Sequence, residues 1–531
     1  MQVLFDVDGE RDIISTAQGA LLLSYYSPRA HNRGINTRWL ETAIHYAKQA
    51  GAHQFTNDAK MTKSQQFTSK RLWWSCILRD RILPLGVHRP LRITHEYFNV
   101  RNNLLTIEDF EGEIQKSRVY DPATKKVLVN LLIELCKLCI VLTDIILIVC
   151  PLDGFPRITS GDTDDSDLRR RIDRCRAALA EWFGNAIIQF PTPAGIGNAN
   201  ESVILFTNLI YIYYHSAKVA LCHHEVLHWD TPSTTDAGYR VQLLTIKKEL
   251  QESIAAITEN TKEVILLKLG KYLPISAVAY TALPLVLHIL DVKLSSTQSQ
   301  RAIKQRQLEV FMEAMKIYRS QYDGTDPVID SIERLFAYLE TGNMLKWHNS
   351  PLQNSHQVNH NVKSMDVSPR TAALAPVIRD WSDVFLQKTR CYLRIAVTLE
   401  LALSKTEYPD DADFPASLQN QYLLSTLFPL YRNSLGEKED DNRYGRARHQ
   451  QSRDHSFRHN GQEHDSDDSP PGSIIRYTGP PSPFRDLAFN SADQESSLDS
   501  HFGIDSAVGT NLTDLDMDAQ VWSDLHFEHY I

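Results

Sequence analysis

Apolar residues recur at the spacing of an α-helix through most of the first 430 residues, and the alternation typical of strands is scarce. This periodicity is the strongest constraint on the fold, because amphipathic helices bury their apolar faces against one another. We therefore predict an all-α fold. The predicted helices cover residues 13–26, 37–50, 70–83, 123–148, 168–183, 203–228, 241–261, 272–292, 302–322, 328–339, 373–404 and 418–431.

Changes in composition divide the chain into four parts. Residues 1–340 are expected to form the main helical region, 341–370 a polar linker rich in Asn, His and Ser, and 371–435 the last helices of the body. From residue 436 the chain is rich in charged residues, His, Ser and Pro, with little apolar material to offset the cost of ordering it. We predict that residues 436–531 form a disordered tail.

Charge and cysteine usage limit the function classes. The formal net charge of -9 gives the whole chain no attraction to nucleic-acid phosphates, so any DNA-binding surface must be local or belong to a partner. The seven cysteines sit mostly in apolar runs, which favours reduced, buried thiols in an intracellular protein over a disulfide framework. The first residues, MQVLFDVDGE, do not have the cationic and apolar pattern of a secretory signal.

Two apolar segments approach the length of a membrane span. Residues 127–150 include Glu134, Lys137 and Asp144, whose charges are costly in hydrocarbon. Residues 272–290 are uncharged but contain two prolines, a histidine and hydroxyl side chains. We expect both segments to be buried core helices and expect no membrane partner.

The end of the predicted tail has a composition of its own. Residues 512–530 interleave acidic residues with large apolar side chains and contain no Lys or Arg. Such alternation is typical of activation segments, whose charges keep apolar anchors solvated until a coactivator groove accepts them. The alternative is an acidic terminus that folds back on the body. The candidate anchors are Leu515, Met517, Trp522, Leu525 and Phe527.

The block KRLWWSCILRDRILPLGVHRPLRIT, at residues 70–94, is the most informative segment. It begins as a helix with apolar bulk around most of its circumference, so other helices should surround it. Within it, Arg79, Asp80 and Arg81 need partners, which we expect on neighbouring helices. Three residues expected to break the helix and turn the chain follow: Pro84, Gly86 and Pro90.

This block resembles the signature of the middle homology region in fungal zinc binuclear-cluster transcription factors, and the cutinase transcription factor group in particular. The family pattern is an Arg-Leu-Trp-Trp helix, then Asp-Arg, then Gly-x-x-Arg-Pro. The matching residues here are Arg71, Leu72, Trp73, Trp74, Asp80, Arg81, Gly86, Arg89 and Pro90. Segments on both sides, such as TRWLETAIHYAKQAGAH and NLIYIYYHSAKVALCHH, resemble further helices of the family, so the resemblance covers residues 1–340.

The resemblance implies a helical regulatory domain of a transcriptional regulator that acts in the nucleus on RNA polymerase II genes, without catalysis. It implies architectural roles for the signature residues, and the alternative is an effector-binding pocket near Trp73 and Arg89. The implied partners are the transcription machinery or a coactivator, and homodimers or heterodimers with zinc-cluster factors.

The sequence departs from the family in one respect. Family members bind DNA through six cysteines that hold two zinc ions, whereas the single CxxC here, Cys136 to Cys139, lies in an apolar helix without a second CxxC. We therefore expect no metal or other cofactor in this chain, and DNA contact only through a missing segment or a partner. The alternative is a DNA-binding-deficient protein that modulates a complete factor.

A different function class is suggested by HEVLH at His224 to His228, which fits the HExxH pattern of zinc metalloproteases. The pattern is short enough to arise by chance, and it lies in a helix that the family resemblance already explains. We therefore expect no catalytic residues, with the metalloprotease as the alternative.

Overall fold

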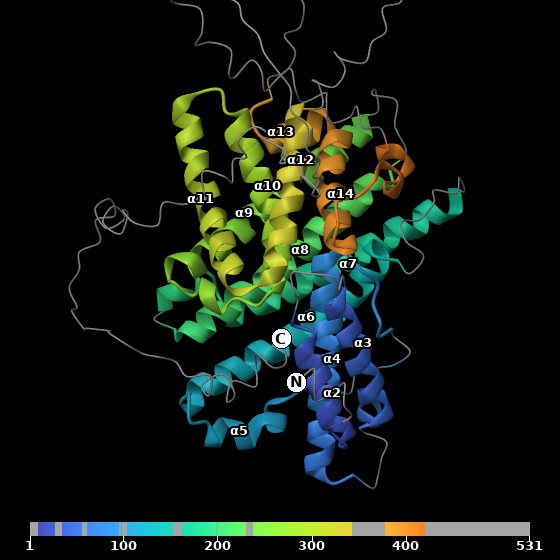
Figure 1. Cartoon of the computed structure of the whole chain (residues 1–531), viewed down its shortest axis with the longest axis vertical. Helices are drawn as coiled ribbons and strands as arrows, with labels where there is room; N and C mark the ends of the chain where they lie inside the picture. Colours follow the sequence, from blue (N-terminus) through green and yellow to red (C-terminus); the bar gives the residue numbers. More distant parts are fainter. Residues whose placement is uncertain are drawn as a thin grey trace, which may run out of the picture.

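The computed structural model describes residues 9–26, 34–55, 61–94, 97, 103–151, 162–197, 199–229, 237–341 and 378–419. Every regular element within these ranges is a helix, which confirms the predicted all-α fold (Figure 1). The predicted tail and most of the predicted linker, together with the helix predicted at 418–431 apart from its first residues, lie outside the described residues.

The α-helices divide into an earlier and a later group along the chain. The earlier group is α2 (Ile13–Leu23), α3 (Ile35–Gln49), α4 (Lys63–Val87), α5 (Glu111–Lys116), α6 (Pro122–Val149) and α7 (Asp162–Gln189). The later group is α8 (Glu201–Leu227), α9 (Ala237–Leu266), α10 (Ser276–Leu294), α11 (Gln298–Gln321), α12 (Asp326–Thr341), α13 (Trp381–Gln387) and α14 (Thr389–Lys405). Short 3-10 turns are η1 (Ala52–Gln54), η4 (Ile107–Phe110), η5 (Ala194–Gly197), η6 (Gly270–Tyr272), η7 (Asp323–Thr325), η8 (Asp411–Asp413) and η9 (Ala416–Leu418).

Polar caps fix several helix starts. Thr62 forms a capping box with Gln65 at the start of α4, and Asp121 accepts hydrogen bonds from two backbone amides at the start of α6. Gly51 follows the end of α3 with φ of 70°, a left-handed conformation that glycine adopts without a Cβ clash.

Figure 1 shows α2, α3 and α4 side by side at one end of the molecule and α9 to α14 at the other, with α6, α7 and α8 crossing between them. The C-terminal end of α4 reaches into the later group, where α4 contacts α8, α10 and α14. One continuous apolar core runs through both groups. The helix that carries the signature therefore joins the two groups of helices.

One helix among the described residues, α10, is long and apolar enough to cross a membrane by length and composition alone. In this structure 78% of its apolar window is buried inside the protein. Its neighbours include α4, α8, α9 and α11. The buried position of α10 agrees with the core helix predicted for this segment.

Beyond shifts of a few residues at the helix ends, the structure differs from the prediction at two breaks in the helical pattern. The predicted break at Pro84 and Gly86 does not occur, because α4 continues to Val87 and ends only at His88, whose φ is 50°. Pro84 has no N–H to bond to the carbonyl of Asp80, four residues earlier, and the Arg81 guanidinium approaches that carbonyl instead (Nη1 to O, 3.4 Å).

The second difference lies in the helix predicted at 373–404. Within it, the structure has two helices, α13 and α14, separated at Lys388, where φ is -138° and ψ is 52°. These angles lie outside the helical region, so the chain turns between the two helices.

The Trp73→Ala substitution should destabilise the protein by about 3–5 kcal/mol, because Trp73 is 1% exposed and its removal leaves a large cavity in the core. Urea unfolding monitored by far-ultraviolet circular dichroism measures this change. The Ile188→Ala control truncates a side chain that is 81% exposed and should change stability by less than about 0.5 kcal/mol. Equal effects of the two substitutions would contradict the buried position of Trp73.

Candidate functional site

The first part of the signature anchors α4 within the core. Leu72, Trp73 and Trp74 are at most 2% exposed. The indole Nε1 of Trp74 donates to the backbone oxygen of Asn103 (2.7 Å), and Arg71 pairs with Glu113 on α5. These contacts hold residues 103–116 against α4, so the first four signature residues act in packing.

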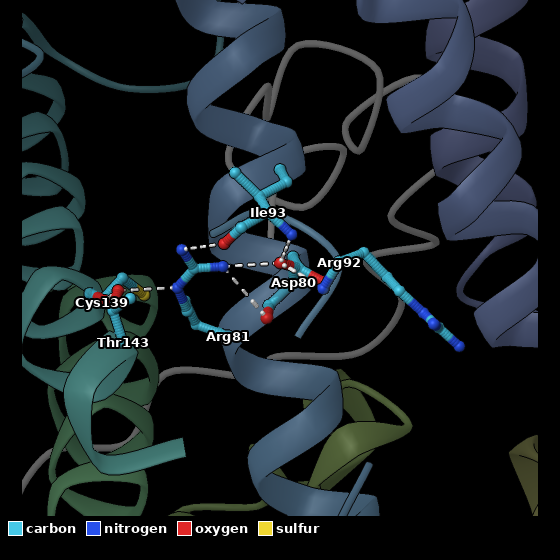
Figure 2. A network of polar contacts seen from close by, with 6 residues as sticks. All are labelled: Asp80, Arg81, Arg92, Ile93, Cys139 and Thr143. Carbon is cyan, nitrogen blue, oxygen red and sulfur yellow. Dashed lines mark hydrogen bonds and ion pairs between the residues drawn. The ribbon is translucent and has the colours of Figure 1, made fainter. Parts of the chain in front are cut away.

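Asp80 and Arg81 form a fully buried ion pair with a distance of 2.6 Å between Arg81 Nη1 and Asp80 Oδ2 (Figure 2). The Asp80 carboxylate also accepts from the backbone amides of Arg92 (3.0 Å) and Ile93 (2.8 Å). Arg81 donates further to the Thr143 hydroxyl on α6 and to the Ile93 carbonyl, both at 2.9 Å. The two side chains thus tie α4 to α6 and to the chain that follows α4.

Two opposing effects determine the pKa of the Asp80 carboxyl. Burial raises the pKa of the Asp80 carboxyl to about 6, against the opposing effects of Arg81 and the two backbone amides. The carboxylate is therefore ionised at neutral pH and neutralises the buried guanidinium. The sequence predicts partners on neighbouring helices. Arg81 has one in Thr143 on α6, but the ion pair itself forms between Asp80 and Arg81, which are adjacent on α4.

Arg79 is also fully buried, and its partners are not carboxylates. Its guanidinium donates to the Ser24 hydroxyl (3.0 Å) and the Ser24 carbonyl (2.6 Å) at the end of α2. The ring of Tyr25 lies 3.9 Å from the guanidinium carbon, a cation–π distance. Arg79 therefore fixes the end of α2 against α4.

Gly86 allows α10 to approach α4 closely. A Cβ at this position would lie 3.3 Å from two ring carbons of Tyr280. The Tyr280 hydroxyl donates to the Ile82 carbonyl, one turn earlier on α4 (2.5 Å). A larger residue here would press on the Tyr280 ring, so the glycine favours this close packing of the two helices, although its φ is in the ordinary range.

Arg89 connects the segment after α4 to two other helices. Its Nε and Nη2 donate to the Ser404 carbonyl at the end of α14 (3.0 and 2.8 Å), and its Nη1 donates to the Thr37 hydroxyl on α3 (2.5 Å). Pro90 follows and is half-buried. Trp73 lies about 21 Å along α4 from its last residue, Val87, and Arg89 follows that end of the helix.

The structure also forms a polar cluster that the sequence analysis did not predict. The Glu400 carboxylate on α14 lies 2.9 Å from Nδ1 of His223 on α8 and 3.9 Å from Nδ1 of His88 at the end of α4. Nε2 of His223 lies 3.0 Å from the Tyr392 hydroxyl. The sequence signal was weak, because His223 stands beside the HExxH pattern and Glu400 is 177 residues away.

In the structure, the glutamate of the HExxH pattern is held in an ion pair. Glu225, which would activate water, is paired with Arg176 (2.6 Å), and Arg176 also pairs with Glu249 (3.2 Å). His228 Nδ1 is hydrogen-bonded to the His224 carbonyl, and burial lowers the pKa of His224 to about 3. Within the described ranges, no group of three or more His, Cys, Asp or Glu residues could hold a metal ion.

Cys136 and Cys139 are fully buried on α6. Burial raises the pKa of Cys139 to about 12 and raises the pKa of Cys136 as well. Both thiols are therefore protonated at neutral pH in this structure. The candidate activation residues form the remaining predicted group, and all lie outside the described residues: Leu515, Met517, Trp522, Leu525 and Phe527.

The Asp80→Asn substitution should destabilise the protein by about 3–5 kcal/mol, because it leaves the buried Arg81 guanidinium without its counter-charge. Urea unfolding measures the change. The control is Glu41→Gln, which removes the partner of the more exposed Arg92 side chain and should cost less than about 1 kcal/mol. If Asp80→Asn costs no more than the control, the buried pair does not have the structural role derived above.

Comparison with known proteins finds a described family that is similar to part of this chain, including the signature. Residues 4–184 match the model of the "Fungal specific transcription factor domain". Cutinase transcription factor 1 beta of Fusarium vanettenii is 23% identical over 349 residues, which are 61% of this chain and 39% of that protein. A transcription factor of Fusarium pseudograminearum (strain CS3096) is 23% identical over 363 residues, 63% of this chain and 40% of that protein.

A third relative, cutinase transcription factor 1 alpha of Fusarium vanettenii, is 27% identical over 139 residues, 26% of this chain and 15% of that protein. The matches to the first two relatives cover 39% and 40% of those proteins, so the chain spans about two fifths of their length. No solved structure matches the chain.

Proposed function

We propose that this chain, which contains a fungal specific transcription factor domain at residues 4–184, is the helical regulatory body of a transcriptional regulator. The observation that carries the proposal is that the matched segment includes the complete signature block. That block forms the buried ion pair and the joint between the two helix groups, so it serves the architecture of the domain. The relatives named above are transcription factors, which supports the same function class.

We further propose that the protein acts in the nucleus on RNA polymerase II genes and reaches DNA through a partner or a segment outside the printed sequence. All seven cysteines are buried, and none belongs to a zinc cluster of the family type. The formal net charge of -9 also provides no general attraction to phosphates. The protein's own contribution is then regulatory, through the transcription machinery or a coactivator.

We propose a non-catalytic role for the body. The polar side chains of the signature are occupied by contacts that hold helices together, and Glu225 is held by Arg176. A catalytic site would need convergent groups left available for a substrate. The HExxH pattern does not provide them in this arrangement.

Tethering the full chain to a reporter promoter through a foreign DNA-binding domain should change reporter transcription. Quantitative measurement of the reporter transcript checks this, with the untethered chain as the control. An unchanged transcript from a stably expressed fusion would contradict the proposal that the chain itself has regulatory activity.

Residues 512–531 alone, fused to the same DNA-binding domain, should activate the reporter through their apolar anchors. The double substitution Trp522→Ala and Phe527→Ala should abolish this activation, because it removes the two largest anchors and leaves the acidic charges. Ser523→Ala is the matched control and should leave activation unchanged. A silent wild-type segment would contradict the activation segment without affecting the result for the full chain.

A further inference from the structure

A buried carboxyl group lies where α10 meets α13. Asp291, near the end of α10, is 8% exposed, and its Oδ1 accepts a hydrogen bond from the backbone amide of Trp381, the first residue of α13 (2.8 Å). Trp381 is buried as well, and its ring stacks on that of Tyr392 on α14, with the centroids 5.9 Å apart. Asp291 therefore lies at the contact by which α10 holds both α13 and α14.

The charged groups that act on this carboxyl come from α11 and from the start of α13. Lys304 on α11 donates through its Nζ to the backbone carbonyls of Asp291 (3.4 Å) and Arg379 (2.8 Å). Asp380 and Asp383 place two like charges close to the Asp291 carboxyl. The ammonium group of Lys304 is thus bound to backbone oxygens, while the nearby side chains of α13 are acidic.

Two other titratable side chains in the same region have partners of their own. Lys247 on α9 pairs with Asp383 (3.6 Å). His288, one turn before Asp291 on α10, has its Nε2 3.0 Å from the Thr258 hydroxyl, and burial lowers its pKa to about 4, so it is neutral near pH 7. In the part of the chain that the structure describes, the Asp291 carboxyl therefore has no ion pair with a Lys, Arg or His side chain.

The surroundings of Asp291 change its affinity for a proton. Burial raises the pKa of the carboxyl to about 7, and Asp380 and Asp383 add to this effect, while the hydrogen bond from Trp381 and the charge of Lys304 oppose it. In an opened form that exposes the carboxyl to water, its pKa returns to the ordinary value of 3.8. Because the closed form has the higher pKa, its stability is greatest below about pH 4 and falls as the pH rises to about 7.

We propose that Asp291 makes the docking of α13 and α14 on α10 dependent on pH, with the tighter contact on the acidic side of neutrality. The neutral acid still offers a carbonyl oxygen to the backbone amide of Trp381. The carboxylate, in contrast, is a third negative charge beside Asp380 and Asp383 in a buried position. Loss of the proton therefore weakens this contact between the helices.

This conformational device goes beyond the proposed function and does not depend on it. Its effect reaches the signature, because α13 leads directly into α14 and the Ser404 carbonyl at the end of α14 accepts from Arg89. Looser docking of α13 and α14 therefore also weakens the contact between the end of the signature and the later group of helices.

Hydrogen–deuterium exchange of the full chain at pH 6 and pH 8, read by mass spectrometry on peptides that cover 381–387, tests the proposal. After correction for the intrinsic exchange rate, protection in the wild type should be about tenfold lower at pH 8. Asp291→Asn keeps the acceptor for Trp381 but cannot ionise, so its protection should be the same at both pH values. Asp330→Asn, at an exposed aspartate on α12, is the matched control and should show the loss seen in the wild type.

A second variant changes the pKa of Asp291 without replacing it. Lys304→Gln removes a positive charge that lowers this pKa, so the loss of protection should continue to a higher pH and should exceed the wild-type loss between pH 6 and pH 8. A purely structural role of Lys304 would lower protection equally at both pH values. Because Asp291 stays in place, this variant decides the question even where Asp291→Asn does not fold.

Three results would each overturn the proposal. The first is equal protection of the wild type at pH 6 and pH 8. The second is a folded Asp291→Asn variant that keeps the wild-type loss. The third is a Lys304→Gln variant whose loss between the two pH values equals that of the wild type.

Discussion

The buried ion pair between Asp80 and Arg81 is the interaction on which the rest of the structure depends. Two charges removed from water are unfavourable unless each is fully hydrogen-bonded, and here the backbone of Arg92 and Ile93 and the hydroxyl of Thr143 complete the arrangement. Because the pair can be satisfied only when the chain after α4 and α6 are in place, it specifies where both segments lie. Arg81 also approaches the Asp80 carbonyl that Pro84 leaves without its helical partner.

The segment that matches the family model is not a separate folding unit in this chain. The match ends at residue 184 in α7, yet α4 contacts α8, α10 and α14, all beyond that residue. Arg89 binds the Ser404 carbonyl on α14, and Gly86 accommodates Tyr280 on α10. The signature residues therefore complete their contacts with helices outside the matched segment, and the core is shared.

The helical class, the main helices and the burial of the signature could be predicted from periodicity and composition, because these depend on local sequence. The continuation of α4 through Pro84 could not, because this end of α4 is buried against α8, α10 and α14, and such tertiary contacts are not visible in the local sequence. The cluster of His223 and Glu400 was equally inaccessible, because the fold alone brings together residues 177 positions apart. The HExxH pattern on α8 can be read from the local sequence, but the pairing of its Glu225 with Arg176 on α7 cannot.

The order of Arg79, Asp80 and Arg81 on consecutive positions has a geometric consequence. Successive residues of an α-helix point about 100° apart, so three adjacent polar side chains leave the helix in three directions. Arg79 reaches the end of α2, Asp80 the backbone after α4, and Arg81 the hydroxyl on α6. The same three residues spaced four apart would lie on one face and could bind only one neighbour. Adjacent placement allows one turn of α4 to be joined to three segments around its circumference, which a helix at the centre of a bundle requires.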